Sequence, residues 1–210
     1  AKNFIIATGS SSIEIPNIPV DEKQIVSSTG ALSLSKIPKS LLVIGGGYIG
    51  LEMGSVWSRL GSKVTVVEAL DRIVPTMDGE IAKEFMKMLT KQGLEFKLSH
   101  KVSSAKSGKS GVDVEMETSD KKKIKENYEI VLMSVGRKPN TEGLGLEKIG
   151  IKLTNKKSIE IKDNFQTSVE GIYAIGDVAP GPMLAHNAEE EGVATPSSSA
   201  LCASIGPGAT

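Results

Sequence analysis

The stretch of the sequence best suited to bind an anion contains four glycines within six residues, Gly45-Gly46-Gly47-Tyr48-Ile49-Gly50. Gly45 permits a tight turn, and Gly47 leaves no side chain between the backbone and a pyrophosphate. Gly50 lets a helix pack closely on the strands beneath it. Free N–H groups at the start of a helix attract phosphate oxygens. The pattern therefore predicts a dinucleotide-binding turn, and the alternative is a glycine-rich turn without a ligand.

An acidic residue downstream of this turn indicates which dinucleotide would bind. Glu68 lies 18 residues beyond Gly50, and none of the three residues after it is an arginine. A carboxylate at this position can accept hydrogen bonds from both hydroxyls of the adenosine ribose, and it repels the 2′-phosphate of NADP. We therefore expect NAD(H) to be preferred over NADP(H). The alternative is a solvent-facing glutamate at a strand end. Glu52, two residues past Gly50, is either directed toward the nicotinamide or a surface residue.

The elements around these residues form a βαβ unit. An apolar strand at 41–44 precedes the turn, a helix at about 48–60 follows it, and a β-branched strand occupies 63–68. Such crossovers are nearly always right-handed. The helix is predicted by the spacing of its apolar residues, which step by four, three and four positions: Ile49, Met53, Val56 and Leu60.

The following segments complete an α/β domain. Asp78 can cap a second helix, and its predicted apolar stripe comprises Ile81, Phe85, Met88 and Leu89. A strand at 94–98 follows. Residues 101–125 are expected to form antiparallel strands with one solvent-exposed face, and an apolar strand is expected at 128–135. We predict a Rossmann-like fold with a parallel sheet, helices and an antiparallel β-meander.

The composition excludes several classes of function. Lys+Arg and Asp+Glu number 25 each, so a basic nucleic-acid interface is not expected. No stretch approaches the ~20 apolar residues of a membrane span. The single cysteine, Cys202, cannot form an intrachain disulfide, and the two histidines lack metal-ligand spacing. We predict no metal site.

Five motifs, in matching order and separation, resemble those of the flavoprotein disulfide reductases, within the pyridine nucleotide-disulfide oxidoreductases, and most of all the dihydrolipoamide dehydrogenases. They are Val43-Ile44-Gly45-Gly46-Gly47-Tyr48-Ile49-Gly50-Leu51-Glu52, Ala7-Thr8-Gly9, Val135-Gly136-Arg137-Lys138-Pro139-Asn140-Thr141, Ala174-Ile175-Gly176-Asp177 and Met183-Leu184-Ala185-His186. The resemblance extends from Ala1 to about Ala194.

The resemblance implies a two-electron relay, in which dihydrolipoamide reduces a redox disulfide, the disulfide reduces FAD, and FAD passes a hydride to NAD⁺. It implies NAD contacts from Gly45, Gly47, Tyr48, Ile49, Gly50, Glu52, Glu68 and Gly136. It implies FAD contacts from Ala7, Thr8, Gly9, Arg137, Gly176, Asp177, Met183, Leu184, Ala185 and His186. A parent enzyme of this kind is expected to be a homodimer bound to 2-oxo acid dehydrogenase complexes, in the bacterial cytoplasm or the mitochondrial matrix.

The chain departs from that family in three respects. It lacks an amino-terminal FAD glycine motif, a closely spaced cysteine pair, and the carboxy-terminal interface domain that supplies a His–Glu base. We therefore expect a central fragment that carries no catalytic residue, does not retain FAD and is inactive alone. The alternatives are a non-catalytic NAD-binding module and another NAD-dependent flavoprotein disulfide reductase.

The expected organisation has four parts. Residues 1–34 form an FAD-domain segment and connection, 35–145 the NAD-binding domain, and 146–194 the FAD-domain return segment. Residues 195–210, rich in Ser, Ala, Gly and Pro, form an unmatched tail that we expect to be disordered. Cys202, within this tail, is expected to be an unreactive thiol.

Overall fold

The computed structural model describes residues 1–195, and the chain divides into two compact units. The central unit is Ser12–Gly136, and the outer unit combines Ala1–Ser11 with the chain from Arg137 onward. The central unit thus begins earlier than the expected NAD-binding domain of 35–145, because β3 (Ile25–Val26) pairs with its sheet. The predicted tail lies outside the described residues except for Thr195, which is buried.

A five-stranded sheet forms the centre of the central unit, and each neighbouring pair of its strands is parallel. In spatial order the strands are β3, β10 (Ile130–Met133), β4 (Ser40–Ile44), β5 (Lys63–Val67) and β6 (Glu95–Lys97). The predicted βαβ unit comprises β4, α2 (Tyr48–Arg59) and β5. The α/β class and its parallel sheet are therefore confirmed.

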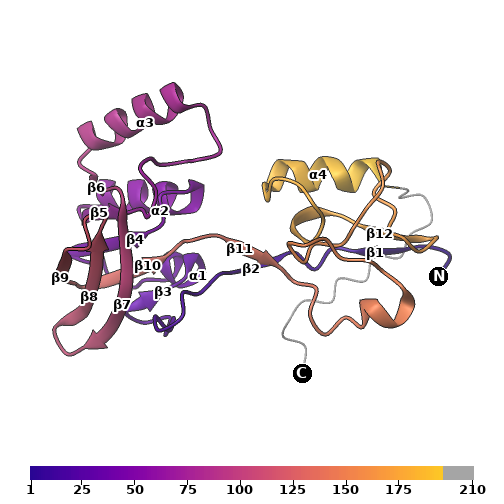
Figure 1. Ribbon diagram of the computed structural model, residues 1–210, viewed down its shortest axis with the longest axis horizontal. Helices are drawn as coiled ribbons and strands as arrows, with labels where there is room; N and C mark the ends of the chain where they lie inside the picture. The colour runs from indigo at the N-terminus through magenta and orange to yellow at the C-terminus, as the bar shows by residue number, and fades with distance from the viewer. Residues whose placement is uncertain (196–210) are drawn as a thin grey trace. The chain divides into compact units, whose positions relative to one another are not determined.

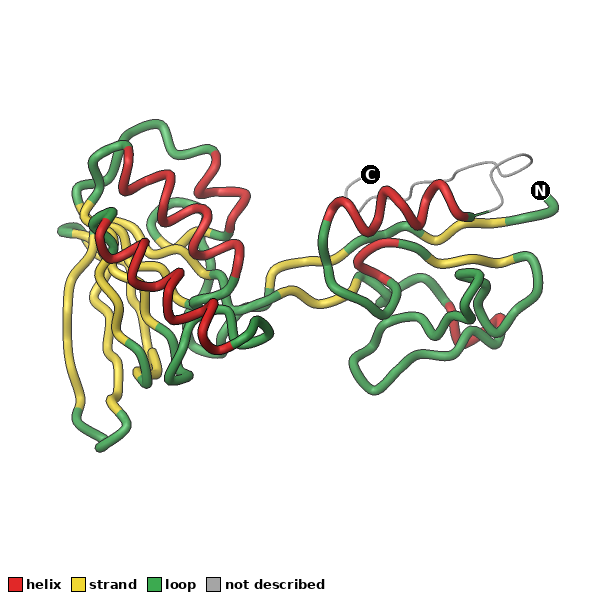
Figure 2. Tube along the Cα trace, turned by 90° about the horizontal axis from the view of Figure 1, so that it is seen from above, coloured by secondary structure: helices red, strands yellow, loops and turns green. Residues whose placement is uncertain are grey.

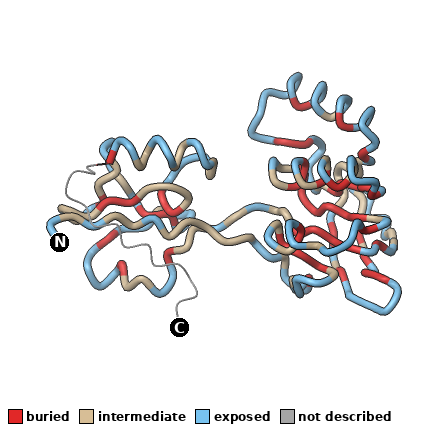
Figure 3. Tube along the Cα trace, turned by 180° about the vertical axis from the view of Figure 1, so that it is seen from behind, coloured by how far each residue is buried: buried red, intermediate tan, exposed pale blue. Residues whose placement is uncertain are grey.

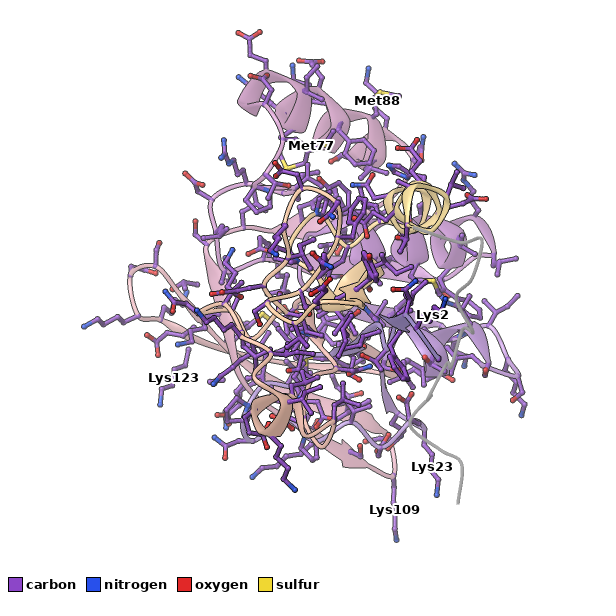
Figure 4. The ribbon with its side chains drawn as sticks, turned by 90° about the vertical axis from the view of Figure 1, so that its right-hand side faces the viewer. Lys2, Lys23, Met77, Met88, Lys109 and Lys123 are labelled. Carbon is purple, nitrogen blue, oxygen red and sulfur yellow. The ribbon has the colours of Figure 1, made fainter. Side chains whose placement is uncertain are left out.

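The sheet is covered by helices on one face and by antiparallel strands on the other (Figures 1 and 2). Alternate residues of β4 point to opposite faces, so that Leu41 and Val43 join the core beneath the helices while Leu42 and Ile44 join the other. The helices are α1 (Ser28–Leu32), α2 and α3 (Gly79–Lys91). The antiparallel strands are β7 (His100–Gly108), β8 (Gly111–Thr118) and β9 (Lys123–Tyr128), as the alternating pattern predicted. Lys109 projects from the β7–β8 turn (Figure 4).

The apolar stripe of α2 is only partly buried. The buried residues are Gly50, Leu51, Gly54 and Trp57. Among the apolar positions at helical spacing, Met53 packs against the core, whereas Val56 and Leu60 are 49% and 50% exposed. The reason is close packing, because a Cβ on Gly54 would lie 3.3 Å from Val64 Cγ1. The glycine-containing face of the helix can approach the sheet more closely than the bulky face can.

The α3 helix begins as predicted but buries less of its apolar stripe. Asp78 Oδ1 accepts hydrogen bonds from the N–H groups of Glu80 and Ile81, at 2.9 and 3.2 Å. Of the predicted stripe only Leu89 is buried, together with Ala82. The rest of the stripe is exposed, and Figure 3 shows most of α3 as solvent-accessible. Met88 projects from this helix in Figure 4.

The outer unit has short strands, two 3₁₀ turns and one helix. β1 (Phe4–Ile6) pairs in parallel with β12 (Ile172–Ala174), and β2 (Ser10–Ser12) pairs with β11 (Arg137–Pro139). The remaining elements are η1 (Leu146–Ile149), η2 (Gly176–Val178) and α4 (Ala185–Ala194). A small core joins them, built around Leu146, Ile151, Ile159, Ala174 and Val178. Within residues 1–195, no helix combines the length and apolarity that crossing a bilayer requires.

Candidate functional site

The glycine turn of the central unit has a backbone that side chains would prevent. Gly45 has φ +108°, a region that L-residues rarely adopt, and a Cβ there would lie 2.4 Å from the carbonyl oxygen of Ser134. A Cβ on Gly50 would lie 2.3 Å from the carbonyl oxygen of Gly45. These two glycines are therefore required by the fold itself.

Gly47 is different, because a Cβ at this position would meet no atom within 4 Å. It is the N-cap of α2, and no side chain caps the helix there. The first hydrogen bond of the helix runs from the Leu51 N–H to the Gly47 carbonyl oxygen, at 3.1 Å. The N–H groups of residues 48–50 therefore have no acceptor within the helix. The turn therefore presents free backbone donors and open space, which suits a phosphate group.

Glu68 lies immediately after β5, beside this turn. Its Oε2 accepts a hydrogen bond from the Gly46 N–H at 2.7 Å, and its Oε1 accepts one from the Leu70 N–H at 2.9 Å. A carboxylate offers about four acceptor positions. The Gly46 and Leu70 N–H groups use two of them. Its contact with Gly46 could not be predicted from spacing.

The other residues predicted to bind NAD lie on α2 or after β10. β4 lies between β5 and β10, so the turn, Glu68 and the segment that reaches Gly136 all follow the carboxyl ends of adjacent strands. Ligands of open α/β sheets bind at that edge. Tyr48 is 45% exposed, and its hydroxyl lies 3.0 Å from Thr76 Oγ1. Ile49 is half-buried and Glu52 is exposed, both on α2.

The outer unit brings together the motifs attributed to FAD. Because Ile6 pairs with Ala174 in parallel strands, Ala7-Thr8-Gly9 and Gly176-Asp177 follow the same sheet edge. Asp177 Oδ2 accepts a hydrogen bond from Ser10 Oγ at 2.5 Å and lies 3.7 Å from Arg137 Nε.

Arg137 holds Ser10 as well. Its Nε donates to Ser10 Oγ and its Nη2 donates to the Ser10 carbonyl oxygen, both at 2.6 Å. Sequence reasoning missed Ser10, because 167 residues separate it from Asp177 and no local pattern signals the contact.

Two further residues hold these motifs in place. Asn140 forms hydrogen bonds with both the side chain and the backbone of Thr8. The backbone carbonyl oxygen of Asn140 accepts from Thr8 Oγ1 at 2.7 Å, and Asn140 Nδ2 donates to the Thr8 carbonyl oxygen at 2.9 Å. Glu191 Oε2, on α4, accepts the N–H of Gly176 at 2.6 Å. Asn140 stands within a motif quoted from the sequence, whereas nothing in the sequence indicated Glu191.

The predicted flavin-facing motif leads into α4. Met183 and Leu184 are half-buried, while Ala185 and His186 are exposed. Leu184 is the N-cap, and no side chain bonds to the helix start. Within residues 1–195, no three His, Cys, Asp or Glu side chains are grouped so as to hold a metal ion.

The chemistry of the two edges fits two different groups. The glycine turn offers backbone donors beside a carboxylate, which fits a pyrophosphate and a ribose. Asp177, held by Ser10 and Arg137, offers a fixed acceptor for hydroxyl groups.

Comparison with known proteins identifies the family of the chain. A family model described as pyridine nucleotide-disulphide oxidoreductase matches residues 1–192. The mitochondrial dihydrolipoyl dehydrogenase 1 of Arabidopsis thaliana is 56% identical over 92% of this chain. A leghemoglobin reductase of Glycine max is 55% identical over the same share. The chain spans only 38% and 37% of the lengths of these two relatives.

Solved structures give the same result. LpdA from Mycobacterium tuberculosis superposes with a TM-score of 0.81 at 30% identity, over 90% of this chain and 40% of that one. The flavoprotein disulfide reductase RclA from Escherichia coli, solved as a Cu(II) complex, has a TM-score of 0.81 at 27% identity, over 91% of this chain and 44% of that one. The family match over nearly the whole described chain, the relatives and the two sheet edges agree: the chain belongs to the pyridine nucleotide-disulphide oxidoreductase family.

Proposed function

We propose that the central unit binds NAD(H) in preference to NADP(H), and that it does so as part of a dihydrolipoamide dehydrogenase. The observation that carries this proposal is the open space at Gly47, which adjoins a turn whose middle glycine is bonded to Glu68. The pyrophosphate would contact N–H groups at the start of α2. The adenosine ribose would bond to the free lone pairs of Glu68, which would repel a 2′-phosphate.

The other NAD residues would complete this site. Tyr48 and Ile49 belong to the first turn of α2, Glu52 would face the nicotinamide, and Gly136 would bring its backbone close to the dinucleotide. Bound NAD⁺ supplies the hydride acceptor, and the protein contributes position and electrostatics.

We propose that the outer unit supplies part of an FAD site. Asp177 would accept hydrogen bonds from the ribityl hydroxyls, and Met183, Leu184, Ala185 and His186 would face the flavin ring. Ala7, Thr8, Gly9, Arg137 and Gly176 would shape the same edge. The 210 residues hold only one glycine turn of the phosphate-binding type, so this chain alone is not expected to retain FAD.

The remaining functional assignments rest on the names of the relatives. Dihydrolipoamide as the electron donor, a redox disulfide, a homodimer and association with 2-oxo acid dehydrogenase complexes are all properties proposed for the whole enzyme. Several relatives, from plants to Dictyostelium discoideum, are named mitochondrial, which favours the mitochondrial matrix over a bacterial cytoplasm.

A calorimetric titration of the chain with NADH, compared with NADPH, tests the proposal. Binding of NADH alone supports the roles of the turn and Glu68. Equal binding of both nucleotides would remove the role assigned to Glu68, and binding of neither would reject an NAD site in this chain.

Two simple assays separate the alternatives. A flavin absorption band at about 450 nm, which comes from FAD itself, would contradict the expected loss of FAD. Lipoamide turnover by this chain would contradict its expected inactivity. NADH binding without either result is expected of the chain alone.

A further inference from the structure

The segment between β5 and α3, residues 69–77, lies beside the glycine turn and is called the strap here. Its two central residues, Ile73 and Val74, are each 1% exposed and belong to the core beneath the helices. The strap is thus anchored by buried side chains although it forms neither helix nor strand.

The strap holds the middle glycine of the turn. The Val74 N–H donates to the Gly46 carbonyl at 2.9 Å, while the Gly46 N–H donates to Glu68 at 2.7 Å. A Cβ on Gly46 would lie 3.1 Å from Ile73 Cγ2. Both backbone polar groups of Gly46 are therefore occupied by protein, and Ile73 leaves little room for a side chain. This explains why position 46 is a glycine, although the sequence pattern of the turn assigns a role only to Gly45, Gly47 and Gly50.

Val74 adopts a conformation that costs free energy. Its φ is +38°, which is unusual for a β-branched residue. Such conformations persist only where the surroundings enforce them, and they cluster at functional sites. Here the buried side chain and the Met77 N–H, which donates to the Val74 carbonyl at 2.9 Å, hold the residue. This conformation directs the Val74 N–H to Gly46.

Both ends of the strap are attached as well. The Leu70 N–H donates to Glu68 Oε1 at 2.9 Å, and the Leu70 carbonyl accepts the Ser99 N–H at 2.8 Å. Near the other end, Thr76 Oγ1 lies 3.0 Å from the hydroxyl of Tyr48, the first residue of α2. The strap therefore contacts the glycine turn, the start of α2 and the Glu68 carboxylate.

We propose that the strap is a cofactor-positioning element that sets the glycine turn and the Glu68 carboxylate in their binding geometry before the nucleotide arrives. This inference rests on the proposed NAD site. Val74 and Thr76 act through Gly46, Tyr48 and Glu68, and are positioning residues. A turn that is already ordered loses less conformational entropy on binding, which raises affinity. A fixed carboxylate also discriminates more sharply against a 2′-phosphate.

Three variants of the 210-residue chain test this role. Val74→Gly keeps the N–H but removes the buried anchor, Thr76→Val removes an exposed hydroxyl, and Thr76→Ser retains that hydroxyl as the matched control. Ala82→Gly, in α3, lowers stability by lost helix propensity and by the loss of one methyl group from the core that contains Val74, and it lies outside the turn and the strap. The measurements are NADH and NADPH dissociation constants, with amide hydrogen exchange of Gly46 and Gly47 in the nucleotide-free chain.

For Val74→Gly we expect about tenfold weaker NADH binding, a smaller NADPH-to-NADH ratio of dissociation constants, and faster exchange at Gly46. Thr76→Val should weaken NADH binding about threefold, Thr76→Ser should restore it, and Ala82→Gly should leave it unchanged. Wild-type affinity and exchange in both Val74→Gly and Thr76→Val would overturn the proposal. Equal weakening in Ala82→Gly would also overturn it, because general destabilisation would then explain the effect.

The two proposals fail in different ways. If the unaltered chain binds neither nucleotide, the NAD site is rejected, and the exchange measurement still decides whether the strap orders the turn. Faster amide exchange at Gly46 in Val74→Gly would support an ordering role of the strap, and unchanged exchange would reject that role.

Discussion

The backbone N–H of Gly46 donates to the carboxylate of Glu68 at 2.7 Å, so the residue predicted to select the nucleotide also binds the turn predicted to hold it. The same carboxylate receives the Leu70 N–H on its other oxygen. Substitution of Glu68 therefore changes two properties together, the recognition of the ribose and the order of the turn.

Glu68→Gln should weaken NADH binding without producing comparable NADPH binding. The amide has only one acceptor oxygen, so either Gly46 or Leu70 loses its bond. Hydrogen bonds to charged groups contribute roughly 1.5–3 kcal/mol, which corresponds to at least a tenfold loss in NADH affinity. Calorimetric titration with each nucleotide measures the effect. NADPH binding as tight as wild-type NADH binding would contradict the dual role.

Gly47→Ala and Gly50→Ala should separate binding from folding. At Gly47 a Cβ meets open space, so the change in unfolding free energy should stay within about 1 kcal/mol. NADH binding should nevertheless be lost, because the methyl group would occupy the space of the pyrophosphate.

At Gly50 the added carbon would lie 2.3 Å from the Gly45 carbonyl oxygen, and destabilisation by about 1–3 kcal/mol or more is expected. Thermal unfolding and NADH titration of both variants provide the comparison. Tight NADH binding by Gly47→Ala would reject this placement of the pyrophosphate.

Asp21 should make the central unit sensitive to acid. Burial alone would raise its pKa, but a hydrogen bond from Ser107 and backbone N–H groups of Lys23, Ile25 and Gln24 lower it to about 2. Because the folded pKa lies below the unfolded value of about 3.9, the contribution of Asp21 is present above pH ~4 and is lost as the pH falls toward ~2.

Asp21→Asn removes this contribution and provides the matched comparison. The difference in unfolding free energy between wild type and Asp21→Asn should shrink as the pH falls from about 5 to about 3. Trp57, the only tryptophan, is buried in the central unit and reports its unfolding by fluorescence. A difference that is constant with pH would contradict the assignment.

Glu191 should hold the turn that carries Asp177. Glu191→Ala removes the acceptor of the Gly176 N–H, so amide exchange at Gly176 should rise by about tenfold or more. Glu191→Gln keeps a carbonyl oxygen at this position and should exchange nearly as slowly as wild type. Equal exchange in the alanine and glutamine variants would show that another group protects Gly176.

Patterns within short stretches of sequence were sufficient for the elements and for the turn. The βαβ unit, the cap at Asp78 and the antiparallel strands were predicted because each depends on neighbouring residues. The required glycines at Gly45 and Gly50 follow from backbone conformation and close packing, which the spacing of the motif already encodes. The placement of the NAD contacts stays a prediction until a nucleotide is titrated.

Tertiary structure decided which faces are buried and which distant groups meet. Helical spacing identified apolar stripes on α2 and α3, but Gly54 allowed a different face of α2 to approach the sheet. The bond between Ser10 and Asp177 spans 167 residues, and the strap reaches Gly46 through a strained Val74. Helical periodicity identifies the residues that share one face of a helix. Whether that face is buried, and which distant groups form hydrogen bonds, depends on the close packing of the folded chain.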